Sequence, residues 1–362
     1  MPSKKPRSAS ELRAALEEDK REQHQLELLS KDTNPQLRRK SAKVADFAEK
    51  LAEQEESRAR TEALVFARTI AMAGLPKRRT KAKMLSRTLR LGKELWLEVS
   101  YHTDEDSELP YGEDRFVLAA IQHLAIEQES PVVYFHHVGS LLEMFGFGRS
   151  GRDFERLRQR FDRLSTFSIR LVFASSEEQL KQRAMGKRSF VIEEFALPTR
   201  DDIKAAEAGQ MILPTIPLDG KGEHSFGVKL SAGFWEHLKE KEHHLLAPVE
   251  LLKLFIDSPT GWDYLCFLIA RCGRARSSTL VDHDILMGLF KEGKEPDRNT
   301  IARLQKYHKL IMTATRGNLK AKIEQMGYLP REKGQRGRPS KRWVLKVYPS
   351  NPIVFSGKKQ IS

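Results

Sequence analysis

One order of predicted elements occurs twice in the chain, and this repeat constrains the fold more than any other feature. Residues 94–200 show, in order, a strand at 95–99, a helix after 112, a strand at 132–135, helices at 137–145 and 151–164, and strands at 167–173 and 189–195. Residues 224–350 show a strand at 226–230, helices at 234–235, 261–272, 282–291 and 297–326, and a closing basic hairpin with its return strand at 343–347. This order predicts an α+β fold, mainly α with small β-sheets, in two tandem winged-helix domains.

Charge and composition divide the rest of the chain. Residues 1–76 carry fifteen basic and thirteen acidic residues and few aromatics, which predicts a charged helical arm, exposed or docked on a partner, or else a disordered one. Residues 77–93 carry eight basic residues and no acid, and we interpret them as a basic linker. Residues 201–223 contain Pro214 and Pro217 and form a second linker, and 351–362 form a tail.

The overall charge favours a polyanionic partner. Sixty-three Lys and Arg against forty-nine Asp and Glu leave a net charge of +14, which favours nucleic acid ahead of an anionic membrane surface. The longest stretch free of charged residues, Ser130–Leu142, is too short to cross a bilayer. With two cysteines and no apolar leader, we expect a cytoplasmic protein with no membrane partner.

Residues 94–130 hold ten acids and the single Arg115, so we expect them to face away from any phosphate backbone.

The predicted helix at 151–164 places arginine and apolar residues on different faces. Its arginines are spaced by four, four and three residues, and its apolar residues by three, four and three. Guanidinium groups can bind guanine edges or phosphates through two hydrogen bonds. The alternative is a solvated surface helix whose acids pair locally with the arginines. We predict that DNA is contacted by this helix and the residue before it, through Arg149, Arg152, Arg156, Arg160 and Arg163.

The long predicted helix at 297–326 has an apolar side and a basic side. Its first turns correspond to the part of a recognition helix that touches base edges. The alternative is a core helix with a basic flank. Residues 291–346 carry sixteen basic residues against five acids, which favours the DNA-binding interpretation through Arg298, Asn299, Arg303, Lys306 and Lys309.

The loop at 334–342 contains an Arg-Gly-Arg-Pro core at the expected tip of a wing. This core resembles a hook that inserts arginines into the narrow minor groove of A·T-rich DNA. We predict contacts from Arg336, Arg338, Lys341 and Arg342.

Motifs of catalysis are missing from the sequence. It has no phosphate-binding loop of the Gly-x-x-x-x-Gly-Lys-Ser/Thr type, and its histidine pairs lack the His-x-His spacing of rolling-circle nickases. Cys266 and Cys272 are interpreted as buried thiols. We therefore expect a protein that is not an enzyme and needs no cofactor or metal.

Several short motifs of the first repeat resemble the RepA-type plasmid replication initiators. They are Leu109-Pro110-Tyr111-Gly112, the Leu141–Gly146 turn, Phe154–Leu157 and Arg160–Leu164. The resemblance covers about residues 90–200 well and 224–350 more loosely, and the amino-terminal arm is not part of it. It implies tandem winged helices that bind repeated double-stranded origin DNA, help open A·T-rich DNA and recruit a host helicase, helicase loader or initiator in the bacterial cytoplasm, with repression of the initiator's own gene as a further role.

Two other interpretations remain open. A winged-helix transcriptional regulator and a plasmid partition protein would have a similar charge and element order. The sequence also suggests a homodimer formed by the strand at 95–99, if that strand lies at the edge of its sheet.

Overall fold

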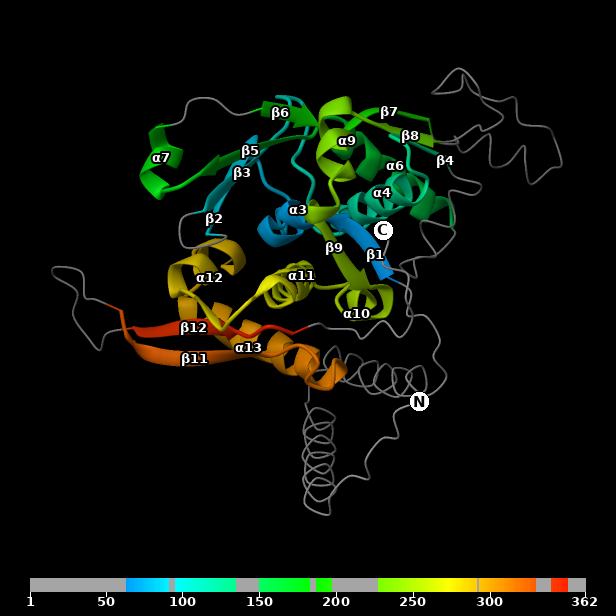
Figure 1. The fold of residues 1–362 in the computed structure, drawn as a ribbon. Helices are drawn as coiled ribbons and strands as arrows, with labels where there is room; N and C mark the ends of the chain where they lie inside the picture. Colours follow the sequence, from blue (N-terminus) through cyan, green and yellow to red (C-terminus); the bar gives the residue numbers. More distant parts are fainter. Residues whose placement is uncertain are drawn as a thin grey trace, which may run out of the picture.

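The computed structural model describes residues 63–90, 95–134, 150–182, 187–196, 227–291, 293–329 and 340–350. Its first part (Figure 1) contains β1 (Ala63–Ala67), α3 (Arg68–Ala73), β2 (Met84–Arg90), β3 (Trp96–His102), α4 (Asp114–Glu127), β4 (Val132–Tyr134), α6 (Gly151–Ser165), β5 (Ser168–Ala174), α7 (Glu177–Gln182), β6 (Lys187–Phe190) and β7 (Ile192–Ala196). Its second part contains β8 (Gly227–Leu230), α9 (Ala232–Lys239), β9 (His244–Pro248), α10 (Val249–Lys253), α11 (Pro259–Arg274), β10 (Thr279–Val281), α12 (His283–Phe290), α13 (Asp297–Ala314), β11 (Ala321–Tyr328) and β12 (Lys341–Val347). A single 3₁₀ turn, Lys241–His243, precedes β9.

The described strands form small antiparallel sheets, and the fold is α+β as the sequence predicts. Their orders are β2-β3-β5-β6, β4-β8-β7, β10-β12-β11 and β1-β9. Among the described residues, no helix has the length and apolar character that crossing a membrane requires.

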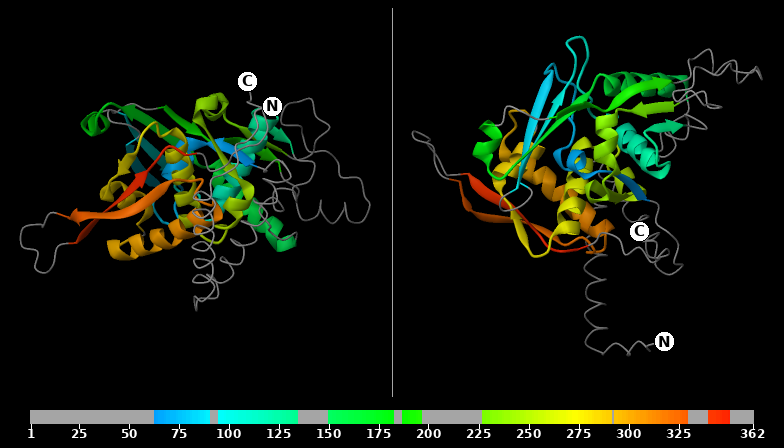
Figure 2. Two further views of the ribbon diagram at one scale, coloured as in Figure 1. Left: turned by 60° about the horizontal axis from the view of Figure 1, so that its bottom comes forward. Right: turned by 45° about the horizontal axis from the view of Figure 1, so that its top comes forward.

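Residues 259–347 follow the element order expected for the second repeat. Helix α11 is followed by β10, α12, α13 and the β11–β12 hairpin, with β12 between the other two strands. The hairpin projects toward one edge of the molecule (Figure 2).

Helix α13 is shorter than predicted. It ends at Ala314, and Arg316 and Gly317 have positive φ angles of 46° and 73° that break the helix. The apolar residues beyond this break, Ile323 and Met326, lie on strand β11, so their spacing matched a helix by coincidence.

Strand β8 differs from the expectation that residues 224–350 form a domain of their own. It pairs with β4 and with β7, so the strand at 227–230 completes a sheet of the first repeat. The following helix, α9, packs against α4 and β6. A strand of four residues carries no local signal of its partner, and for this reason the sequence could not place it.

Residues 63–76, expected to belong to the arm, lie in the core. β1 pairs with β9, and Phe66 stacks on Trp262 of α11 with ring centroids 6.5 Å apart. Trp262 also meets Phe116 of α4 edge-on at 4.5 Å. One apolar core therefore runs through both repeats.

The expected dimer contact through residues 95–99 is wrong. β3 lies between β2 and β5 and hydrogen-bonds to both, so it has no free edge, and Leu97 is completely buried. Its partner β2 is formed by residues 84–90, which the sequence assigned to a linker. The alternation of Leu85, Arg87 and Leu89 with exposed residues is a strand pattern that the charge of this stretch concealed.

A buried ion pair joins the two repeats. Arg115 on α4 binds Asp263 on α11, and both side chains are about 5% exposed or less. The same guanidinium group donates to the carbonyl oxygens of Pro259, Leu75 and Pro76 at 3.0–3.2 Å. Removing either partner would leave a buried charge uncompensated.

Candidate nucleic-acid interface

Helix α6 forms where the sequence predicts it. Ser150 accepts a hydrogen bond from the backbone N–H of Asp153, whose carboxylate accepts one from the backbone N–H of Ser150, so a capping box starts the helix. Leu157, Phe161 and Leu164 are buried, and Phe161 stacks on Phe195 of β7. The opposite side of the helix faces solvent.

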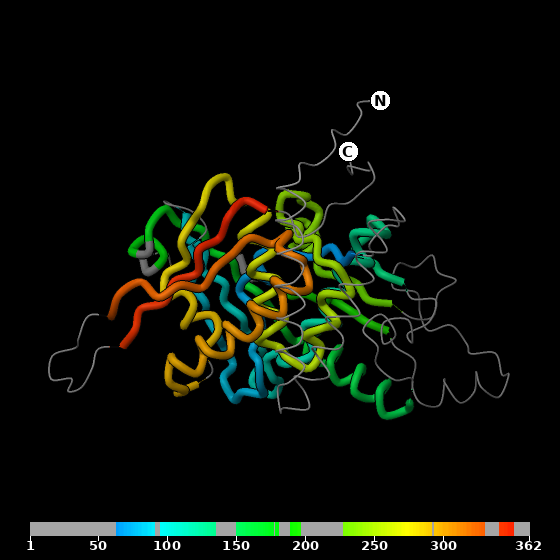
Figure 3. The backbone as a smooth tube through the Cα atoms, turned by 90° about the horizontal axis from the view of Figure 1, so that it is seen from below, coloured from blue at the N-terminus to red at the C-terminus, as the bar shows by residue number. Residues whose placement is uncertain are grey.

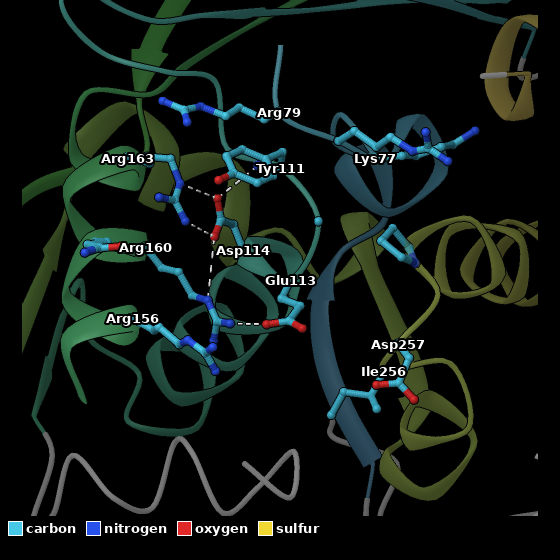
Figure 4. A pocket seen from close by; sticks show the side chains of 14 residues that line it. Lys77, Arg79, Tyr111, Glu113, Asp114, Arg156, Arg160, Arg163, Ile256 and Asp257 are labelled. Atoms are coloured by element: carbon cyan, nitrogen blue, oxygen red, sulfur yellow. Dashed lines mark hydrogen bonds and ion pairs between the residues drawn. The ribbon is translucent and has the colours of Figure 1, made fainter. Parts of the chain in front are cut away.

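The predicted arginines of α6 divide into two pairs, and Figure 4 shows Arg156, Arg160 and Arg163. Arg152 is exposed, and the side chain of Arg156 is 54% exposed with one weak contact of 3.8 Å to Asp153. Arg160 is 9% exposed and binds Glu113. Arg163 is 18% exposed, binds both carboxylate oxygens of Asp114 at 2.8 Å and stacks over Tyr111.

The prediction that Arg160 and Arg163 contact DNA is therefore wrong. Their side chains hold α6 against the start of α4. The arginine stripe lies along the border between the buried and the exposed face of α6. Glu113, which precedes α4, and Asp114, its first residue, bind the arginines at this border. The spacing of the arginines shows that they share one face of the helix. It does not show which other element of the fold that face contacts. Burial lowers the pKa of the Arg163 guanidinium, but its bonds to Asp114 outweigh this and raise it.

An open groove of about 500 Å³ lies beside this ion-pair cluster. Its lining includes Arg156 and Gln159 of α6, the segment Lys77–Arg79, and Ile256–Asp257 before α11. Six cationic and three acidic side chains line it, so it is net positive. The groove was not predicted from the sequence, where the acid-free run after Pro76 is the signal that points to it.

Helix α13 exposes a basic face. Arg298, Asn299 and Lys306 are exposed and Lys309 is half-buried, while Ile301 and Leu304 on the other side are buried. Arg298, Ala302, Lys306 and Lys309 recur at three- and four-residue spacing, so they share a face along the helix. These side chains are therefore accessible to a ligand, and DNA binding by them stays a prediction.

The prediction that Arg303 contacts DNA is wrong, because its side chain binds groups within the protein. Its guanidinium group donates to both carboxylate oxygens of Glu295 at 2.6 and 3.0 Å and to the carbonyl oxygen of Phe290 at 2.9 Å. These bonds fasten α13 to the end of α12.

Asp297 anchors the start of the same helix. It accepts from Lys291 at 2.7 Å and from His283 at 3.1 Å. Burial raises the pKa of Asp297, but these two bonds outweigh it, so the pKa lies below its usual value. The helix start is thus fixed by polar contacts that leave its first exposed cation, Arg298, in solvent.

Of the expected wing residues, Lys341 is exposed and Arg342 is exposed with one bond of 2.9 Å to Asp282. Arg149, Arg336 and Arg338 lie outside the described residues.

Viewed from below, α6 and the start of α13 both reach the lower edge of Figure 3, α6 at the right and α13 at the left, whereas Figure 1 places α6 in the upper part of the molecule and α13 at the bottom. Their exposed cations are Arg152 and Arg156 on α6, and Arg298, Lys306 and Lys309 on α13. A polyanion long enough to reach from α6 to α13 could contact both helices at once.

No family model and no curated protein matches the chain. Two crystal structures of domains 2 and 3 of RctB, each 12% identical, resemble it with TM-scores of 0.45 and 0.41. They cover 78% and 77% of this chain, and the chain covers 98% and 96% of them. TM-scores below 0.5 do not establish a common fold, so the function has to be argued from the residues of this chain.

The described residues contain no group of three or more His, Cys, Asp or Glu side chains placed to hold a metal ion. Cys266 and Cys272 are buried as predicted, and burial raises the pKa of both thiols. Raised pKa values are unfavourable for a nucleophilic thiolate.

Proposed function

We propose that this chain is a replication initiator that binds double-stranded DNA through helices α6 and α13. The observation that carries the proposal is that two helices packed on one shared core each expose a separate set of cations. Each set lies on a helix whose other side is buried, as in helices that enter the major groove.

The element order of residues 259–347 supports a winged helix in which α13 is the recognition helix. Helix, strand, two helices and a two-stranded hairpin, with the first strand beside the last, is the arrangement in which the third helix is presented to DNA. Lys341 and Arg342 on β12 would then follow the wing and contact the DNA beside the site read by α13.

The finer proposal is initiation of plasmid replication. The motifs around Tyr111 and Arg160 that resemble RepA-type initiators favour repeated origin sequences as the DNA target. Origin opening, recruitment of host replication proteins and repression of the initiator's own gene are the activities that this resemblance implies. All would take place in the bacterial cytoplasm, without nucleotide or metal.

The test compares DNA arrangements. The full chain is titrated against the DNA flanking its own gene, divided into fragments that carry direct repeats, inverted repeats or neither, in gel shifts at several salt concentrations. An initiator binds direct repeats beside an A·T-rich stretch, and its binding constant falls steeply with salt because several phosphates are neutralised at once.

Binding confined to an inverted repeat at a promoter would favour the regulator, and binding to a partition site would favour the partition protein. Salt-independent binding, or none, would overturn the DNA-binding proposal itself.

A further inference from the structure

The basic segment 77–83 lies between the two repeats, and the DNA-binding proposal above does not use it. Backbone bonds hold both of its ends: Pro76 O accepts from Gly112 N and Lys83 O accepts from Thr103 N, each at 3.0 Å. The Lys77 ammonium group donates to Leu289 O of α12 at 3.1 Å. The segment therefore has a fixed position beside both α4 and α12.

Between these anchors the segment presents cations to solvent. Arg78, Arg79 and Lys81 are exposed, and the first two line the groove together with Arg156 of α6. Figure 4 shows Arg79 beside Arg163 and Tyr111. In Figure 3 the segment leading from α3 to β2 lies between α6 and α13.

The ion pair made by Arg79 adds little to the stability of the fold. Arg79 binds Glu108 through an ion pair whose arginine side is 73% exposed, and ion pairs of this kind contribute little to stability. Three like charges in four positions also repel one another when no anion is near. A polyanion on this side of the molecule would relieve that repulsion.

The chemistry of the groove favours phosphate over a small neutral ligand. Guanidinium and ammonium groups bind phosphate oxygens directly, and the groove between α6 and residues 77–79 is open to solvent. Duplex DNA contacting both helices would cross the segment with its backbone, since phosphates follow one another along each strand.

We propose that segment 77–83 is a phosphate-binding strap that holds the DNA backbone between the sites contacted by α6 and α13. This inference rests on the proposed DNA binding. It assigns the strap affinity without base preference, because phosphate contacts carry no sequence information directly.

The experiment measures the salt dependence of binding to a labelled duplex of about 40 base pairs, roughly four helical turns. Arg78→Ala and Lys81→Ala should each lower the slope of log K against log salt by about 0.9 and weaken binding roughly three- to ten-fold at about 0.1 M salt. The loss should be equal for all duplex sequences. Lys239→Ala is the matched control, because it removes an exposed cation from α9, which contributes no lining residue to the groove.

Glu108→Gln provides a test in the opposite direction. It removes the acid that binds Arg79 in the free protein, so binding should tighten several-fold and the slope should steepen. If the wild type binds DNA with a steep slope while these three variants behave like Lys239→Ala, the strap is refuted and the proposed function stands. If the wild type itself does not bind, the proposed function fails first.

Discussion

Arg156 and Arg163 lie seven residues apart on α6 and should respond differently to truncation. Arg156 is more than half exposed, so Arg156→Ala should weaken DNA binding by about 1 kcal/mol and leave the free energy of unfolding unchanged. Arg163→Ala leaves Asp114 buried without its main partner and should cost about 2–4 kcal/mol of stability. Urea denaturation and fluorescence anisotropy on both variants separate the two roles, and equal effects on stability would contradict the assignment.

On α13 the matched pair is Arg298 and Arg303. Arg298→Ala should cost about 1–3 kcal/mol of binding and change base preference at one position if the side chain reads a base edge. Arg303→Ala should lower stability by a similar amount, because Glu295 loses both of its bonds to the guanidinium group. Binding to a randomised-site library measures the first effect, and thermal unfolding measures the second. A change of base preference in a fully folded Arg303→Ala variant would contradict its structural role.

His237 makes stability depend on pH. Burial, with His243, Arg68 and His244 nearby, lowers its pKa to about 4, and its ring stacks on His243 and hydrogen-bonds to Thr69. Below pH 6.5 His237 binds a proton in the unfolded chain but stays neutral in the folded chain. The free energy of unfolding should therefore fall as the pH decreases from 6.5 to about 4. Allowing for partial exposure, the loss is about 1–2 kcal/mol. Urea midpoints across this range should shift less in His237→Gln; an equal shift would assign the effect to other groups.

At the scale of single residues, sequence patterns identified charged positions better than their partners. The exposed cations Arg152, Arg156, Arg298 and Lys306 have the surface placement expected of DNA contacts. Arg160, Arg163 and Arg303 share the same periodicity, but acids distant in the sequence or on the preceding turn bind them. Tertiary pairing of this kind leaves no trace in local spacing.

At the scale of elements, the helix at 151–164 was predicted well, whereas α13 ends earlier than predicted and short strands were not placed in their sheets. Helix α6 spans Gly151–Ser165 against a prediction of 151–164, because a capping box and two distinct faces specify it. The residues of β2 were assigned to a linker, and those of β8 were assigned to the second repeat although β8 pairs with β4 of the first. A short strand depends on the partner strand beside it, which local sequence does not reveal.

The central position of β3 gives a prediction for Leu97. Leu97→Lys would place a charge in the core between β2 and β5, where no acid is paired with it, so the variant should lose about 4 kcal/mol or more and expose apolar surface. Circular dichroism and dye binding measure this loss. Leu97→Met, which keeps the volume and the apolar character, should remain folded. A folded Leu97→Lys variant that changes only its oligomeric state would contradict the position of β3.

At the scale of the whole molecule, the two repeats are not independent. Trp262 of α11 packs on Phe66 and on Phe116, and the Arg115–Asp263 pair lies beside them. A chain that ended at Gly220 would lack β8, β9 and α11 and leave these partners uncovered. The element order of residues 259–347 matches the prediction, whereas the predicted helix at 137–145 lies outside the described residues. Element order alone could not show that the two repeats share one interior.

The buried ion pair between Arg115 and Asp263, which joins the two repeats, also limits which DNA the protein can bind. One core fixes the position of α6 relative to α13. The protein can therefore bind two contact sites at once only when both sites face the same side of the DNA duplex. Adding about 5 base pairs between the sites turns one of them to the far side of the duplex, whereas adding about 10 restores its direction. Binding should therefore be lost with the first insertion and partly recovered with the second, as measured in gel shifts on the three spacings. Two domains on a flexible tether would tolerate both insertions equally.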